Sequence, residues 1–126
     1  MNSNEVKYTR EHEWIKVEGK LARIGITDYA QKSLGDVVFV ELPDLDRELK
    51  AGEVMGVVES VKAVSDIYAP CTGRVITVNE ALLDSPELIN QDPFGDGWMV
   101  EVELDGLDEE LLSAQEYEEL VKEEAE

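Results

Sequence analysis

Apolar positions recur along the chain in short runs that either alternate with polar residues or are rich in β-branched side chains. Such runs predict β-strands, and glycine, proline and charged residues typical of turns separate them. The predicted strands are 6–9, 14–18, 21–26, 37–42, 48–49, 54–58, 63–68, 74–78 and 98–104. Many short strands with little helix predict a mainly β fold, an antiparallel sandwich or a flattened barrel.

Helical signals are few in the first hundred residues. A short helix is predicted from Thr27 or Asp28, either of which can cap it, to a stop at Gly35. Residues 80–83 predict one helical turn. Residues 84–97 contain two prolines and two glycines, and this composition predicts a long ordered loop of a kind that is often functional.

The C-terminal segment, about 108–124, is predicted to be a helical extension. Residues 113–116 have the spacing of a capping box, which predicts the start of a helix. Beyond it, Tyr117, Leu120 and Val121 fall at helical spacing and form one apolar stripe suited to docking on the strands.

The chain reverses direction around Lys62 with almost no connecting sequence between two predicted strands. Tight two-residue hairpins favour glycine or asparagine because their central residues need positive φ, and residues 60–63 contain neither. A turn that breaks such a rule is often strained or functional. From spacing alone, Lys62 is either an ordinary surface lysine or a lysine displayed on a protrusion that the active site of another protein can surround.

Length and charge limit the possible functions. The chain of 126 residues is expected to be a single domain, and it has neither an apolar run of membrane-spanning length nor a targeting pattern. We expect a bacterial or archaeal cytoplasmic protein; a mitochondrial protein without its transit peptide is the alternative. The net charge of −19 argues against nucleic acid and anionic membranes as partners. Solubility, adaptation to a salty cytoplasm, and guidance toward basic docking faces remain as explanations.

Cys71 is the only cysteine, so no disulfide can form within the chain. Pro70 and Gly73 predict a turn over 70–73, in which Cys71 is expected to be incidental. With one histidine in the chain, no metal site is expected. Gly56 and Gly73 are expected to permit bends or the close approach of strands.

The residues around Lys62 resemble the lipoyl hairpin of glycine cleavage system H proteins. The resemblance rests on Glu59-Ser60-Val61-Lys62-Ala63 with Asp66, and on Gly73 after the hairpin. Further segments resemble the same family, in the family's order, and cover nearly the whole chain: 12–14, 25–31, 34–43, 79–83 and 92–99. The resemblance implies a barrel-sandwich hybrid of two antiparallel sheets, with the lipoyl hairpin at about 54–68 and a C-terminal helix.

The resemblance also implies a mechanism. Lys62 would carry lipoic acid in amide linkage on its ε-nitrogen. The protein would be a non-catalytic carrier whose lipoyl arm visits the active sites of other enzymes. Pyridoxal-phosphate-dependent glycine decarboxylase releases carbon dioxide and leaves an aminomethyl group on a lipoyl sulfur. Aminomethyltransferase passes the carbon to tetrahydrofolate, and the FAD enzyme dihydrolipoamide dehydrogenase reoxidises the dithiol. A lipoate-attaching enzyme loads the lysine, and the carrier is expected to be a monomer.

Acidic residues are candidates for sheltering the loaded arm, because the aminomethyl group is a cation when protonated. Glu13 and Asp66 are the candidates, with ordinary solvated carboxylates as the alternative; no role is assigned to Glu11. Glu59 is assigned to recognition by the lipoylating enzyme. His12 is expected to be structural rather than a base. The aromatic residues Trp14, Phe39 and Trp98 are expected in the core or at its rim.

Five other functions would make different demands on the sequence. Biotinyl domains typically place methionine on both sides of the modified lysine, whereas here the neighbours are Val61 and Ala63. Lipoyl domains of 2-oxo acid dehydrogenases are shorter and would not account for residues 12–14 or the C-terminal helix. A Schiff-base lysine needs a lowered pKa, but the carboxylates beside Lys62 would raise it. An acidic interaction module without a cofactor explains the negative net charge but not the lysine at the tight reversal of the chain. An H-like protein that donates lipoyl groups to other enzymes remains open.

Overall fold

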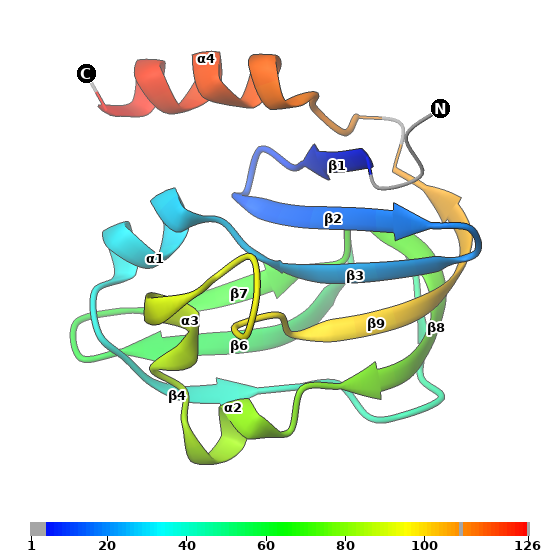
Figure 1. Cartoon of the computed structure of the whole chain (residues 1–126), viewed down its shortest axis with the longest axis horizontal. Coiled ribbons are helices and arrows are strands. Elements are labelled where there is room, and N and C mark those ends of the chain that lie inside the picture. Colours follow the sequence, from blue (N-terminus) through cyan, green and yellow to red (C-terminus); the bar gives the residue numbers. More distant parts are fainter. Residues whose placement is uncertain (1–4, 109, 126) are drawn as a thin grey trace.

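Two antiparallel sheets form the body of the protein in the computed structural model, which describes residues 5–108 and 110–125 (Figure 1). The larger sheet has six strands in the order β1-β2-β3-β9-β8-β5, and the smaller has three in the order β4-β6-β7. The strands are β1 (Glu5–Tyr8), β2 (Glu13–Glu18), β3 (Leu21–Ile26), β4 (Val37–Glu41), β5 (Glu48–Leu49), β6 (Val54–Ser60), β7 (Val64–Tyr68), β8 (Cys71–Val78) and β9 (Val100–Leu107). This arrangement confirms the predicted fold class.

One apolar core lies between the two sheets. Ile15 and Ile24 from the larger sheet and Val58 from the smaller are fully buried. Full burial of one such side chain stabilises the fold by roughly 1.5–3 kcal/mol. The predicted alternation of β9 is confirmed where Val100 and Val102 are buried.

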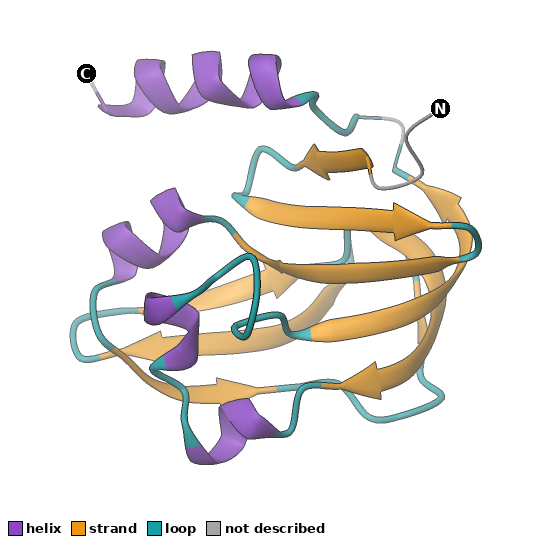
Figure 2. Cartoon of the chain, in the orientation of Figure 1, coloured by secondary structure: helices purple, strands orange, loops and turns teal. Residues whose placement is uncertain are grey.

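The described residues form four helices that flank the sheets (Figure 2): α1 (Asp28–Leu34), α2 (Ala81–Asp84), α3 (Leu88–Gln91) and α4 (Ala114–Ala125), of which α4 lies along β1 and α2 beside β4. The predicted limits of α1 are confirmed, because the Thr27 hydroxyl accepts from the Ala30 N–H and Gly35 ends the helix with φ 81°. The predicted capping box is also confirmed, since Ser113 and Glu116 exchange backbone-to-side-chain hydrogen bonds. None of the helices in the described part of the chain is long and apolar enough to cross a membrane.

The predicted loop 84–97 is wrong in part, because it contains α3. Ile89 of this helix is fully buried, and the Asn90 side chain accepts a hydrogen bond from the Val37 N–H. These contacts with distant residues stabilise a helical turn in a segment whose prolines and glycines alone predict a loop.

The predicted turn at 70–73 is wrong, because β8 already begins at Cys71. β9 extends to Leu107, which pairs with Cys71, so the chain finds strand partners where its local composition indicates a turn. Cys71 is fully buried and therefore not an incidental turn residue. Burial raises the pKa of its thiol to about 12, which makes it unreactive.

The predictions for two glycines are confirmed. A Cβ at Gly56 would meet the carbonyl oxygen of Glu41, and a Cβ at Gly73 would meet that of Glu103. Both positions adjoin register shifts in their strand pairs. A glycine therefore allows the neighbouring backbone to approach closely at each bend.

Candidate functional site

The β6–β7 hairpin displays Lys62 at one end of the molecule, at the left of Figure 1. The two strands pair up to Glu59 and Val64, and the chain turns through residues 60–63. Lys62 is exposed, and the side chain of Val61 is 70% exposed. The ε-amine is thus accessible to another protein.

The hydroxyl of Ser60 closes the turn. It accepts hydrogen bonds from the Lys62 N–H (3.2 Å) and the Ala63 N–H (3.0 Å), while the Ser60 N–H donates to the Ala63 carbonyl (2.7 Å). Among the described residues other than glycine, only His12 and Asp46 have positive φ. The turn therefore contains no residue in the left-handed region, so it does not require the glycine or asparagine that its sequence lacks. The sequence-based prediction did not consider Ser60, although a serine side chain can close a turn by accepting hydrogen bonds from nearby backbone N–H groups.

Two contacts attach the turn to the end of α1. The Val61 N–H donates to the Asp36 carbonyl at 3.0 Å. The Lys62 side chain lies beside Gly35, where an added Cβ would be 3.4 Å from the lysine Cε. The turn is held at its backbone while the amine remains at the surface.

Replacing Ser60 by alanine is expected to lower the free energy of unfolding by about 1–2 kcal/mol, because two N–H groups lose their acceptor at a largely buried position. Amide hydrogen exchange at Lys62 and Ala63 should accelerate together with this loss. Urea unfolding measures the first effect, and Ser65→Ala on β7 is the matched control. Equal effects of the two substitutions would contradict the capping role.

A groove of about 170 Å³ lies beside the hairpin, between α1 and β7. Its lining residues are Glu11, His12, Ile26, Ala30, Ser33, Leu34, Ser65 and Ile67. Leu34 precedes Gly35, against which the Lys62 side chain lies, so one end of the groove begins near the lysine. We call this hollow the α1–β7 groove. Its wall is largely apolar, and Glu11 contributes a carboxylate.

Glu13 is buried rather than solvated. Its Oε1 accepts from the Thr9 hydroxyl (2.6 Å) and its Oε2 from the Tyr68 N–H (3.0 Å), so the side chain ties the start of β2 to the end of β7. Burial raises the pKa of Glu13 to about 7, although these two hydrogen bonds lower it; the nearby charge of Glu11 also raises it. Glu13 lines a second hollow, of about 320 Å³, on the Tyr68 side.

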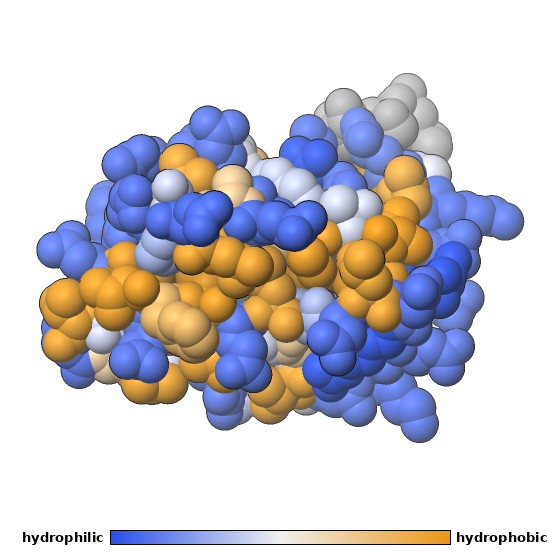
Figure 3. Space-filling view, turned by 90° about the horizontal axis from the view of Figure 1, so that it is seen from below, coloured by the Kyte–Doolittle hydropathy of each residue, from blue (hydrophilic) through white to orange (hydrophobic). Residues whose placement is uncertain are grey.

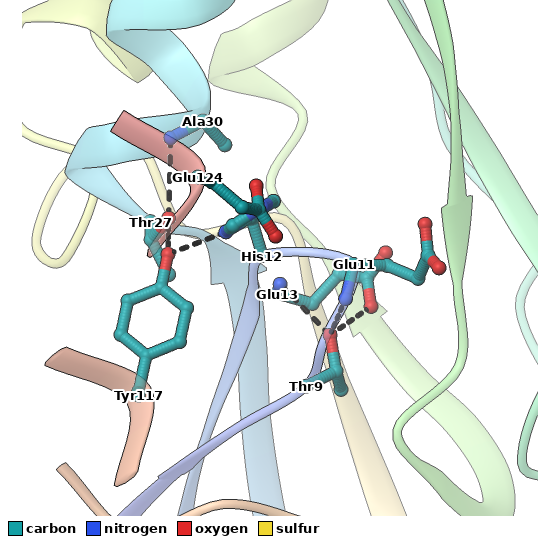
Figure 4. A network of polar contacts seen from close by, with 8 residues as sticks. All are labelled: Thr9, Glu11, His12, Glu13, Thr27, Ala30, Tyr117 and Glu124. Carbon is teal, nitrogen blue, oxygen red and sulfur yellow. Dashed lines mark hydrogen bonds and ion pairs between the residues drawn. The ribbon is translucent and has the colours of Figure 1, made fainter. Parts of the chain in front are cut away.

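A polar network fixes the C-terminal helix to this region (Figure 4). His12, with φ 70°, places Nδ1 2.8 Å from the Tyr117 hydroxyl and Nε2 2.8 Å from the Glu124 carboxylate. The Tyr117 hydroxyl also lies 2.6 Å from the Thr27 hydroxyl, which caps α1. The network joins α4, α1 and the 9–13 turn, and it supports the structural interpretation of His12.

The other predicted carboxylates lie elsewhere. Asp66 and Glu59 are exposed on the smaller sheet. Because side chains alternate along a strand, Asp66 points to the opposite face of β7 from Ser65 and Ile67, which line the groove. Asp66 therefore lies outside the α1–β7 groove, and it is not among the residues that line the second hollow with Glu13. Glu11, to which the sequence analysis assigns no role, lines both hollows. Its position two residues before Glu13 is the sequence feature from which a role near the site could have been predicted.

A small two-sheet body that presents one lysine on a closed hairpin defines a class of protein. It is the class of carrier proteins, in which a lysine-linked cofactor reaches the active sites of other enzymes while the carrier itself performs no chemistry.

The comparisons with known proteins give the family. The family model of the glycine cleavage H-protein matches residues 6–124. The chain is 58% identical over 124 residues to the glycine cleavage system H protein of Carboxydothermus hydrogenoformans, covering 97% of this chain and 95% of that one. It is 54% identical over 122 residues to that of Staphylococcus epidermidis, covering 95% and 97%. A crystal structure of a glycine cleavage system H protein from Mycobacterium marinum matches with a TM-score of 0.86 and 38% identity, covering 100% of both chains. The chain belongs to the glycine cleavage H-protein family.

Proteins of this family are non-catalytic lipoyl carriers that shuttle the aminomethyl group of glycine. Their partners are glycine decarboxylase, aminomethyltransferase and dihydrolipoamide dehydrogenase. The predictions of family, fold, carrier function, cofactor and these partner enzymes are thus confirmed, and the biotinyl, 2-oxo acid dehydrogenase, Schiff-base and cofactor-free alternatives are excluded.

Proposed function

We propose that Lys62 is the lysine that carries the lipoyl group. The observation that supports this most strongly is its position, exposed at the tip of a hairpin whose backbone is closed by Ser60 and attached to Asp36. Amide formation at its Nζ removes the ammonium charge. The lipoyl group, when bound, supplies a disulfide that is reduced as it takes up the aminomethyl group and is later reoxidised. The chain supplies an accessible and positioned attachment point.

The α1–β7 groove fits the arm. An aliphatic chain ending in a five-membered ring is mostly apolar, and the groove presents Ile26, Leu34 and Ile67 to it. Burying such surface is favourable by about 25 cal/mol per Å². Glu11 offers a carboxylate to the ammonium of the aminomethyl group. We assign Glu11 as the acidic group that shelters the cargo, while the buried Glu13 ties the start of β2 to the end of β7.

The attachment is tested by the intact mass of the protein coexpressed with a lipoate ligase and supplied with lipoate. We expect a gain of one lipoyl group in the wild type and in Lys32→Arg, which changes an exposed lysine on α1, and no gain in Lys62→Arg. A gain that persists in Lys62→Arg would place the arm elsewhere. No gain in any form, with a ligase active on another acceptor, would refute attachment.

The sheltering role predicts faster loss of the aminomethyl group from a loaded Glu11→Ala variant. Loss of one carboxylate near a partly buried ammonium corresponds to roughly a tenfold acceleration. The release of formaldehyde and ammonia from purified, loaded protein measures the rate, and Glu18→Ala, an exposed carboxylate on β2, is the control. An unchanged rate in both Glu11→Ala and Glu13→Ala would remove the role.

We further propose that the protein works in a bacterial cytoplasm. Support comes from the relatives described above, which are bacterial proteins. Fractionation of the source cells with an antibody to the protein tests this location; recovery in another compartment would contradict it.

A further inference from the structure

A β-bulge in β4 turns two consecutive apolar side chains outward. The pairing of β4 with β6 shifts register between Val37 and Phe39, which makes Val38 the extra residue. Val38 and Phe39 are each 50% exposed, whereas Val37 and Val40 on either side are 3% and 2% exposed. A regular strand would turn only one of the two middle side chains outward. The bulge therefore adds a large apolar side chain to the surface beside the hairpin.

The outer face of the smaller sheet alternates apolar and acidic side chains in two rows. Each row crosses β4, β6 and β7 through paired residues: the first row is Phe39, Glu59 and Val64, and the second is Glu41, Val57 and Asp66. We call these six residues the hairpin face. All of them are exposed except Val57, which is half-buried. The first row ends directly before the turn that carries Lys62.

The apolar part of this surface extends beyond the hairpin. Figure 3 views the molecule from the side of β4 and α2 and shows apolar residues gathered over a broad area, with charged residues among them. Leu83 of α2, which packs beside β4, is 57% exposed. Contiguous apolar surface next to a functional group is typical of a protein–protein contact.

The charge of this region has one sign once the lysine is acylated. Residues 36–41 and 54–68 contain four carboxylates and one base, which is Lys62. Acylation removes the positive charge of that base, so every remaining charge in these segments is negative. Two copies meeting through this face would oppose like charges, which disfavours self-association. An apolar surface that carries lysine or arginine residues complements it.

We propose that the hairpin face is a docking surface for an enzyme that takes the lipoyl arm. The enzyme's surface, at the entrance to its active site, carries apolar side chains against Phe39 and Val64, and basic side chains against Glu59 and Asp66. The proposal rests on attachment of the arm at Lys62. It gives Asp66 a role in docking instead of in sheltering the cargo, in keeping with its place outside the groove.

The first test removes the apolar contacts. Binding of glycine decarboxylase, aminomethyltransferase and dihydrolipoamide dehydrogenase is measured by calorimetry in a Lys62→Gln background, in which the arm is absent and residue 62 is neutral, as it is after acylation. We expect the double variant Val38→Ser/Phe39→Ser to weaken the Kd for at least one enzyme about tenfold or more. The control is Leu21→Ser/Leu107→Ser, which removes equally exposed apolar side chains from the larger sheet. Thermal unfolding checks that both proteins are folded.

The second test removes the charges. The triple variant Glu41→Gln/Glu59→Gln/Asp66→Asn is expected to weaken binding to the same enzyme at low salt and to reduce the salt dependence of the Kd. A control that changes Glu18, Glu119 and Glu123 to glutamine alters the net charge equally on other surfaces. Equal effects of the two triple variants would show steering by total charge and overturn the assignment to this face.

Three further results would overturn the proposal. The face variants could bind all three enzymes as their controls do. The Lys62→Gln protein could bind none of the enzymes, which would show that the face does not dock without the arm. The protein could form dimers that the Val38→Ser/Phe39→Ser variant abolishes, which would show that a second copy occupies the face. Attachment at Lys62 is read separately by intact mass, so its failure is distinguishable from a failure of docking.

Discussion

Replacing Lys62 by arginine is expected to abolish glycine cleavage in a system reconstituted from this protein, its three partner enzymes and lipoate ligase. Arginine keeps the positive charge but presents no amine for the amide linkage to lipoic acid. The fold should be retained, because Lys62 is exposed and its side chain lies beside Gly35 at the surface. We expect the free energy of unfolding to change by less than about 0.5 kcal/mol.

Exchange of labelled bicarbonate into glycine measures the activity, and Lys32→Arg, which changes a lysine 72% exposed on α1, is the control. Residual exchange in Lys62→Arg would show that a second group carries the cargo. The same assay separates the carrier from a lipoyl donor, since a wild-type protein that is lipoylated but supports no exchange would favour the donor role.

Raising the pH from 5 to 8 is expected to destabilise the wild-type protein through Glu13. Its pKa is about 7 in the folded state, against 4.5 for an unperturbed carboxyl, because the side chain is buried. The folded state therefore holds the proton more tightly than the unfolded state. The stability that Glu13 contributes is fully present below pH 4.5 and is lost as the pH rises through 7. The difference between the two pKa values corresponds to roughly 3 kcal/mol.

Urea unfolding of the wild type and of Glu13→Gln at both pH values measures this effect. Glutamine has no proton to lose, so its unfolding free energy should lack this part of the pH dependence, while its altered hydrogen bonds with Thr9 and Tyr68 shift stability equally at each pH. Glu18→Gln, on the same strand, is expected to follow the wild type. Parallel pH profiles for wild type and Glu13→Gln would show that Glu13 is ionised throughout.

The sequence by itself determined most of the local structure. The hairpin of β2 and β3, the limits of α1 at Thr27 and Gly35, and the capping box of α4 follow from interactions between residues close together in the chain. The position of Lys62 where the chain reverses between β6 and β7 also follows from residues close to it in the chain. Alternation, caps and turns act over a few residues, so a single sequence contains the whole signal. The contiguous motif around Lys62 identified the family for the same reason.

Only the tertiary structure decided which residues share a face or a hollow. β8 begins at Cys71 because β9 supplies a partner there, and α3 forms because Ile89 is buried under distant elements. Glu13 is buried through its contact with Tyr68, which lies 55 positions further along the chain. The bulge that exposes Val38 depends on the register between β4 and β6. Register and burial are set by contacts between segments far apart in sequence, and no local pattern in either segment specifies them.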